Sequence, residues 1–424
     1  MSDRKKNPDI YRHSRYYARQ RQLRLRLAAA VGGFCILLLV LAVLNGTHSR
    51  RSTRSVQDSQ QVSSRTEAGS QEQASSSSGP EDSSAPAAQN PEEGVEKEDA
   101  PSPAPEKVTL KLSVIGDCTL GTDEYFDWDS SLNNYFDMYG PEYFFRNVRD
   151  IFSEDDLTIG NFEGTLTYSE EREDKQFAFK GDPAMVSILT EGKVEAVNTA
   201  NNHSHDYGYQ SYEDTLKALD NAGLVNFGYD KTAVMDVKGV KVGLVGIYEL
   251  DDHLMREQQL RDNIQKVKDA GSQLIVVIFH WGNELEEVPD TNQLTLGRLA
   301  VDLGAHLVCG HHPHVVQGIE TYKGKNIVYS LGNFCFGGNT LPTDMDTMIY
   351  QQTFTITPEG VQEDPAYNVI PCSVSSEDWI NNYQPTPASG EDADRIMQKI
   401  QERSSWIPEP AVTVDTNSLP GMAL

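Results

Sequence analysis

Residues 273–282 of this 424-residue chain read Gln-Leu-Ile-Val-Val-Ile-Phe-His-Trp-Gly. An unbroken apolar run of this length, rich in β-branched residues, is typical of a strand that is buried on both faces of a sheet. Such strands occur in parallel sheets covered by helices, so the segment indicates an α/β fold. His280 follows the run directly, and the strand is therefore expected to deliver an imidazole to the edge of the sheet.

Other apolar runs alternate with amphipathic segments along the chain. Strands are predicted over residues 108–115, 157–159, 194–197, 240–247, 306–309 and 326–331. Helices are predicted over 212–221, 255–270, 293–303 and 393–404, and a hairpin is expected to turn at 358–360. Strands that alternate with helices in this way define the α/β class.

Residues with metal-binding side chains stand where several of these runs end. In open α/β sheets, ligands gather at the carboxyl ends of the strands. Carboxylate, carboxamide and imidazole groups together form the ligand set of a divalent transition metal. Each residue alone could have a purely structural role, such as capping a helix or forming a turn. The recurrence of such residues at several strand ends favours a metal site and hydrolytic chemistry. The predicted ligands are Asp117, Glu163, Asn202, His280, His312 and His314.

The predicted ligands His312 and His314 belong to the segment Gly310-His311-His312-Pro313-His314. His312 and His314 have the spacing His-x-His, and Pro313 limits the conformation of the residue before it. An extended turn here would aim two imidazoles at one region. Whether His311 also takes part stays open.

The segment that begins at Asn201 contains an imidazole and a carboxylate that could take part in proton transfer beside the expected metal. His203 follows the predicted ligand Asn202 and is expected to protonate a leaving group. Asp206 is expected to orient a histidine through a hydrogen bond. The alternative is a polar turn that caps the next helix, because Asn, Ser and Asp are common in turns.

The N-terminal quarter of the chain predicts a membrane anchor. Residues 1–26 contain nine Lys or Arg, and residues 27–44 contain no charged residue. Eighteen apolar residues can span a bilayer, and the basic side faces the cytoplasm. We therefore expect a basic cytoplasmic tail over 1–26, one transmembrane helix over 27–44 and an extracytoplasmic remainder; a cleaved signal peptide is the alternative. Residues 45–106, rich in Ser, Gln, Glu and Pro, predict a disordered linker.

Residues 107–424 are strongly acidic, with 22 Lys or Arg against 50 Asp or Glu and a formal net charge of −28. No basic stripe is available to neutralise phosphates, so nucleic acid is excluded as a partner. An anionic substrate would have to be attracted locally, which a bound divalent metal would do. The cysteines of this part are expected to be buried free thiols rather than disulfides.

Six phrases together resemble the bacterial capsule synthesis protein CapA family, also called the poly-γ-glutamate synthesis protein family. The resemblance runs in order from about residue 110 to 340. It implies a calcineurin-like metallophosphoesterase β-sandwich flanked by helices, expected over 107–372 with a C-terminal extension over 373–424. The phrases are Val-Ile-Gly-Asp-Cys-Thr-Leu-Gly (114–121), Gly-Asn-Phe-Glu-Gly-Thr-Leu (160–166), Ala-Asn-Asn-His-Ser-His-Asp-Tyr-Gly (200–208), His-Trp-Gly (280–282), Gly-His-His-Pro-His-Val (310–315) and Tyr-Ser-Leu-Gly-Asn-Phe (329–334).

The resemblance to metallophosphoesterases has two departures. Their first motif is Asp-x-His, whereas Thr119 stands at its last position here. Their Asn-His phrase continues with an acid, whereas Ser204 stands here. One of the two usual metal positions is therefore short of a ligand. Either His280 or Glu163 compensates, or a single metal is bound.

Two functions follow from this resemblance. In the first, the domain is a metal-dependent hydrolase that uses Mn, Zn or Fe and acts on an anionic cell-envelope polymer or a phosphoester. In the second, it is a non-catalytic accessory subunit that works with polymer synthase and export subunits. Retention of a full polar set favours the hydrolase.

Overall fold

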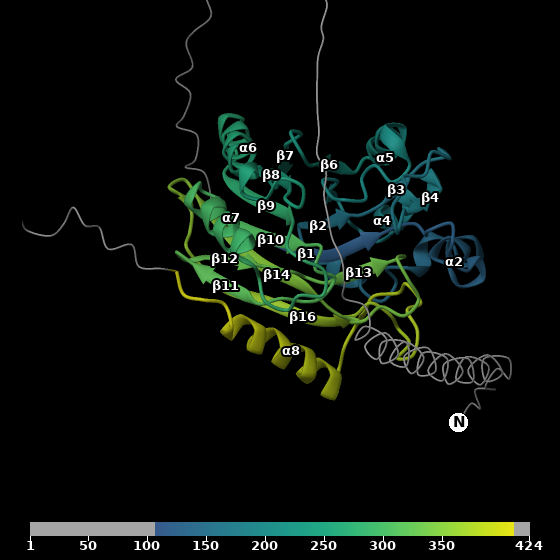
Figure 1. Cartoon of the computed structure of the whole chain (residues 1–424). Coiled ribbons are helices and arrows are strands. Elements are labelled where there is room, and N and C mark those ends of the chain that lie inside the picture. The colour runs from purple at the N-terminus through teal and green to yellow at the C-terminus, as the bar shows by residue number, and fades with distance from the viewer. Residues whose placement is uncertain (1–106, 411–424) are drawn as a thin grey trace, which may run out of the picture. The chain divides into compact units, whose positions relative to one another are not determined.

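A computed structural model describes residues 107–410 (Figure 1). The expected cytoplasmic tail, transmembrane helix and linker lie outside the described residues. Within 107–410, no helix is both long enough and apolar enough to cross a membrane.

The first sheet carries most of the N-terminal strands. Its order is β17-β16-β14-β1-β2-β5-β6, with β13 paired to β1 and β15 paired to β14. The strands β1, β2, β5 and β6 run parallel, whereas β14, β15, β16 and β17 form antiparallel pairs. The bounds are β1 Val108–Thr119, β2 Leu157–Phe162, β5 Ala196–Asn198, β6 Val225–Phe227, β13 Asn333–Phe336, β14 Asp346–Thr357, β15 Gly360–Val361, β16 Tyr367–Ser373 and β17 Thr386–Pro387.

The second sheet has the order β11-β12-β10-β9-β8-β7, with β8, β9, β10 and β12 parallel. Strands β3 and β4 form a separate two-stranded parallel sheet. The bounds are β7 Ala233–Val237, β8 Val240–Tyr248, β9 Leu274–His280, β10 Leu307–His311, β11 Ile319–Tyr322, β12 Lys325–Val328, β3 Thr165–Leu166 and β4 Lys180–Gly181.

The two sheets pack face to face, and strand β9 shows why its sequence is continuously apolar. Leu274, Val276 and Ile278 join the core between the sheets. The alternate residues Ile275, Val277 and Phe279 pack with helices on the outer face. Because both faces of the strand are covered, the apolar run confirms the expected α/β class.

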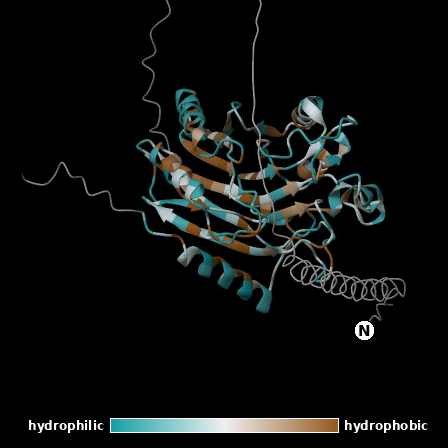
Figure 2. Cartoon of the chain, in the orientation of Figure 1, coloured by the Kyte–Doolittle hydropathy of each residue, from teal (hydrophilic) through white to brown (hydrophobic). Residues whose placement is uncertain are grey.

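Helices cover both outer faces of this sandwich, and Figure 2 shows the hydrophobic strands between more hydrophilic helices. Helices α6 and α7 pack on the second sheet. Helices α2, α3, α4 and α5 contribute to the cluster on the outer face of the first sheet. The bounds are α2 Leu132–Tyr139, α3 Arg149–Ser153, α4 Ser187–Glu191, α5 Gly208–Asn221, α6 Glu257–Asp269 and α7 Thr291–Asp302.

The last helix, α8 (Gly390–Ser405), closes an edge of the sandwich. It contacts β16 of the first sheet and β11 of the second. Ile396 and Ile400 enter the core between the sheets, and Ser404 Oγ accepts a hydrogen bond of 2.8 Å from the amide of Ile319. Helix α8, which lies beyond residue 372, is thus packed into the same core, and strand β16 spans that position.

Several local predictions are confirmed. The hairpin turns between β14 and β15, with Gly360 in a backbone conformation of φ 126° that favours glycine. The four described cysteines are buried free thiols, and burial raises the pKa of each. They are Cys118, Cys309, Cys335 and Cys372.

A close approach of backbone to backbone lies just before Asp117. The amide of Asp117 donates a hydrogen bond of 2.9 Å to the carbonyl of Gly332, and a Cβ at Gly116 would stand 2.1 Å from that same oxygen. We expect Gly116→Ala to lower the free energy of unfolding by roughly 1–3 kcal/mol, the usual cost of overpacking.

Gly160→Ala is the matched control, because its Cβ would meet side chains rather than backbone, Ile115 at 3.3 Å and Cys118 Sγ at 3.9 Å. Denaturant unfolding of both variants checks this. Equal losses at Gly116 and Gly160 would contradict the proposed role of the contact.

Candidate metal centre

The first sheet brings a row of polar residues to one level near the ends of its strands. Asp117 on β1 pairs in register with Asn161 on β2 and with Asn333 on β13. Asn161 in turn pairs with Asn198 on β5. The side chains are bonded along this row: Asn161 Nδ2 donates to Asp117 Oδ1 at 2.8 Å, and Asn198 Nδ2 donates to Asn161 Oδ1 at 2.8 Å. The register of the strands thus places the buried side-chain amides of Asn161 and Asn198 so that they hold the carboxylate of Asp117 in position.

The second sheet supplies a matching row of rings. His280, the last residue of β9, pairs in register with Tyr248 on β8 and with His311 on β10. His280 Nδ1 lies 3.2 Å from Asn161 Nδ2, so the two rows meet across the sandwich. Both rows lie at the carboxyl ends of parallel strands, where the sequence places them.

Glu163 lies at the centre of the group. Its Oε2 accepts a hydrogen bond of 3.1 Å from Thr119 Oγ1, but its buried Oε1 has no hydrogen-bond partner among the described residues. Three imidazole nitrogens surround this oxygen: Nε2 of His280 at 3.8 Å, of His203 at 3.9 Å and of His314 at 3.9 Å.

These separations fit a shared metal ion better than direct hydrogen bonds. Two ligands that hold one ion at about 2.1 Å each can lie at most about 4.2 Å apart. A buried carboxylate oxygen without a donor is costly, and a cation would satisfy it. The residues present at Glu163 therefore fit a metal.

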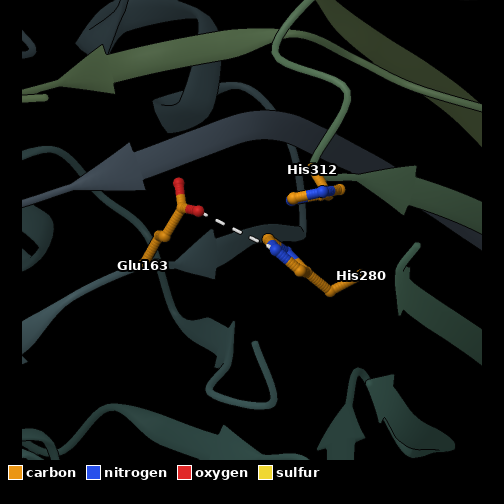
Figure 3. A group of neighbouring side chains, drawn as sticks. All are labelled: Glu163, His280 and His312. Atoms are coloured by element: carbon orange, nitrogen blue, oxygen red, sulfur yellow. Dashed lines mark ion pairs between the residues drawn. The ribbon is translucent and has the colours of Figure 1, made fainter. Parts of the chain in front are cut away.

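His312 completes a fully buried group with Glu163 and His280, whose ligand atoms lie within 4.8 Å of one another. Figure 3 shows the two imidazoles side by side, with Glu163 pointing toward them; the ring centres are 4.8 Å apart. Burial, helped by neighbouring histidines, lowers the pKa of His280 well below its usual value and that of His312 to about 3. Both rings are therefore neutral, the form that binds metals.

The turn that carries His312 differs from the extended turn expected from its sequence. His312 has φ 94° and His314 has φ 58°, both in the left-handed region that non-glycine residues rarely adopt. The prediction of an extended backbone was wrong, because two left-handed residues around Pro313 turn both rings toward Asp117 and Glu163. Such strain is kept where surrounding contacts impose it, and it commonly marks functional sites.

Asp117, His311 and His314 form the other side of the group. Asp117 Oδ1 lies 3.1 Å from His311 Nδ1, and Asp117 Oδ2 lies 3.3 Å from His314 Nδ1. Burial alone would raise the pKa of Asp117, but hydrogen bonds to these histidines hold it well below its usual value. Burial would lower the pKa of His314, but Glu163 and Asp117 raise it to about 10. The two carboxylates thus favour a positive charge here, which a metal ion bound by neutral His314 would supply in place of the proton.

Asn202 also reaches the group. Its Oδ1 lies 2.8 Å from His280 Nε2, so the carboxamide and the ring face the same space. The structure therefore brings together all six residues predicted as ligands. His311 joins them because its ring lies next to Asp117.

His203 and Asp206 form a hydrogen-bonded pair beside Glu163. His203 Nδ1 lies 2.8 Å from Asp206 Oδ2. Asp206 also accepts from the amide of Phe179 at 2.5 Å and from Lys175 Nζ at 2.7 Å. With Nδ1 held by the carboxylate, His203 Nε2 faces Glu163 Oε1 at 3.9 Å.

Two charged residues of the site were missed from the sequence. Lys175 lies in an irregular segment and contacts the carbonyl of Asn202 at 2.7 Å as well as Asp206. No periodicity marks that segment, so no signal was available. Glu284 groups with His312 and His314 within 4.8 Å. Glu284 follows His280 by four residues in the sequence. An acidic residue so close to a predicted ligand could have been recognised as a further candidate.

Comparisons with known proteins agree with this arrangement. Residues 111–338 match the family described as bacterial capsule synthesis protein PGA_cap. The chain is 31% identical over 263 residues to the capsule biosynthesis protein CapA of Bacillus anthracis, spanning 56% of this chain and 62% of that protein. It is 30% identical over 282 residues to the PGA biosynthesis protein CapA of Bacillus subtilis, spanning 60% and 72%.

A further relative is a probable polyglutamine synthesis accessory protein of Mycobacterium tuberculosis, 28% identical over 208 residues, or 42% of this chain and 55% of that protein. The first-named relative, from Bacillus anthracis, is thus matched over less than two thirds of its length. The family match itself spans more than half of the 424 residues and includes every predicted ligand. The chain therefore belongs to the bacterial capsule synthesis protein PGA_cap family.

Proposed function

We propose that this chain is a metal-dependent hydrolase of capsule or poly-γ-glutamate biogenesis. Its substrate would be a phosphoester or a bond in an anionic cell-envelope polymer. The observation that carries the proposal is the bare Oε1 of Glu163 with imidazole nitrogens at 3.8–3.9 Å. A calcineurin-like metallophosphoesterase fold is part of the proposal, supported by a two-sheet sandwich with helices on both faces and ligands at the strand ends.

The metal ion would be Mn, Zn or Fe, and the six residues predicted as ligands from the sequence would hold it. Such an ion supplies Lewis acidity and lowers the pKa of water. Carboxylate and imidazole together suit all three metals. The residues are Asp117, Glu163, Asn202, His280, His312 and His314.

The chain's own proton chemistry would rest on His203. Asp206 holds the ring at Nδ1 and fixes its orientation and tautomer, as the acid partner of a catalytic histidine does. Nε2 is then free to give a proton to a leaving group. Lys175 keeps Asp206 in place from its other oxygen, at 2.7 Å.

The second candidate is a non-catalytic accessory subunit of a polymer synthesis and export complex. The name of the Mycobacterium tuberculosis relative favours it, because that protein is described as an accessory protein. In that case the same site would bind or position an anionic chain without cleaving it.

We also propose that the chain is a single-pass membrane protein with its main domain outside the cell. The support is the nine Lys or Arg before residue 27 and the uncharged run that follows.

The first prediction concerns metal binding. Reconstitution of the purified, chelator-treated full-length chain with Mn²⁺ should raise its Tm, because a ligand present at 100 times its Kd stabilises by about 2.7 kcal/mol. His280→Ala should bind less metal and show a smaller rise. His253→Ala is the control, because that exposed histidine pairs only with Glu249 outside the site. A folded wild-type chain that stays metal-free after reconstitution would defeat the proposal.

The second prediction separates the enzyme from the scaffold. His203→Ala should retain metal while turnover falls by about 10²–10⁴, the usual contribution of a general acid. The loss should be smaller for phosphoesters whose leaving group departs without a proton. In a deletion strain, His203→Ala, Glu163→Ala and His280→Ala should fail to restore polymer output at normal protein level. Full restoration by all three would establish the scaffold instead.

The third prediction concerns topology. Protease added to intact protoplasts should remove the folded domain and leave a short membrane-bound stub, because everything after residue 50 is expected outside. Immunoblotting with antibodies against the domain checks this. A domain that stays protected until the cells are lysed would contradict the proposed orientation.

A further inference from the structure

We propose that Glu284 is a ligand of a second, solvent-facing divalent cation, which it binds together with His312 and His314. This inference rests on the proposed function and deepens it. The chain would then hold one buried ion near Glu163 and one ion at the mouth of the site. Glu284 would take the place of the histidine that metallophosphoesterases carry where Thr119 stands here.

The first support is proximity. Ligand atoms of Glu284, His312 and His314 all lie within 4.8 Å of one another. Ligands of one transition-metal ion lie at most about 4.2 Å apart, so only a small movement is needed. Glu284 is exposed, and its flexible carboxylate can make that movement at little cost, whereas the two histidines are held by the turn.

The second support is the way the backbone fixes this loop. The amide next to Glu284, that of Leu285, donates a hydrogen bond of 2.8 Å to the carbonyl of Pro313, between the two histidines. Gln317 Nε2 donates at 2.9 Å to the carbonyl of Glu286. The loop is thus attached directly to the His-Pro-His turn, and Glu284 is held beside both rings.

The third support is a buried nitrogen without a partner. His312 is buried, and its Nδ1 has no hydrogen-bond partner among the described residues. His312 also belongs to the buried group with Glu163 and His280. A neutral imidazole coordinates through one nitrogen only, so His312 is assigned to the outer ion, and Glu163 and His280 stay with the buried one.

The fourth support comes from position 119. Thr119 cannot replace an imidazole there, because its hydroxyl donates to Glu163 Oε2 at 3.1 Å. A ligand for the second ion must therefore come from another element. Two imidazoles and one carboxylate are the ligand set of catalytic zinc sites, which keep one position open for water or substrate. Glu284, at the solvent-facing side, provides that set without closing the site.

The test counts metal ions on the purified full-length chain after chelator treatment and reloading with Mn²⁺. Wild type should bind two ions per chain by elemental analysis, and Glu284→Gln should bind one. The affinity lost for the second ion should reach at least the roughly 10–100-fold that loss of an outer partner costs. Glu286→Gln is the matched control, because it removes the same charge from an exposed position in the same loop.

Electron paramagnetic resonance gives a second readout that does not depend on activity. Two Mn²⁺ ions in one site should show a spin-coupled signal in wild type and in Glu286→Gln, and an isolated-ion signal in Glu284→Gln. Two ions with unchanged affinity in Glu284→Gln, or a single ion in wild type, would overturn this inference while leaving the hydrolase proposal intact. A wild-type chain that binds no Mn²⁺ would instead defeat the proposed function itself.

Discussion

The structure depends on the register of strand β1 against its neighbours. Asp117 reaches the site only because it stands level with Asn161 and Asn333, and a slip of one residue would turn its side chain to the opposite face. The hydrogen bond from the Asp117 amide to the carbonyl of Gly332 holds β1 beside β13. The register of β1 therefore determines both how the sandwich packs and which polar side chains reach its edge.

That constraint creates an electrostatic problem, because Asp117 and Glu163 are both fully buried. Burial disfavours the charged carboxylate, and the pKa of Glu163 is raised mainly for that reason. The imidazoles of His311 and His314 lie within 3.3 Å of Asp117, but within residues 107–410 no donor reaches Oε1 of Glu163. A sequence selected for stability alone would replace these groups with apolar residues, so their presence supports the proposed metal ion.

The sequence predicted the strand ends well and the connections poorly, for a physical reason. Strand β9 has a signal in its own residues, since burial on both faces demands an unbroken apolar run. The contacts of Lys175 with Asp206 and the left-handed backbone of His312 arise only when distant segments meet. Thr119 illustrates the same limit: its departure from the expected motif was visible, but its bond to Glu163 was not.

Charge connects this site to the process that the family name describes. The part of the chain after residue 106 has a formal net charge of −28, and a poly-γ-glutamate chain is itself an anion. Long-range attraction between the two is therefore excluded, and the surface would repel the polymer. The site's own charges are largely paired, since Lys175 contacts Asp206 at 2.7 Å and the histidines face Asp117 and Glu163. The proposed metal ion would supply the net positive charge, so an anionic group would be stabilised only after it enters the site. The acidic surface would thereby restrict binding to groups that fit there.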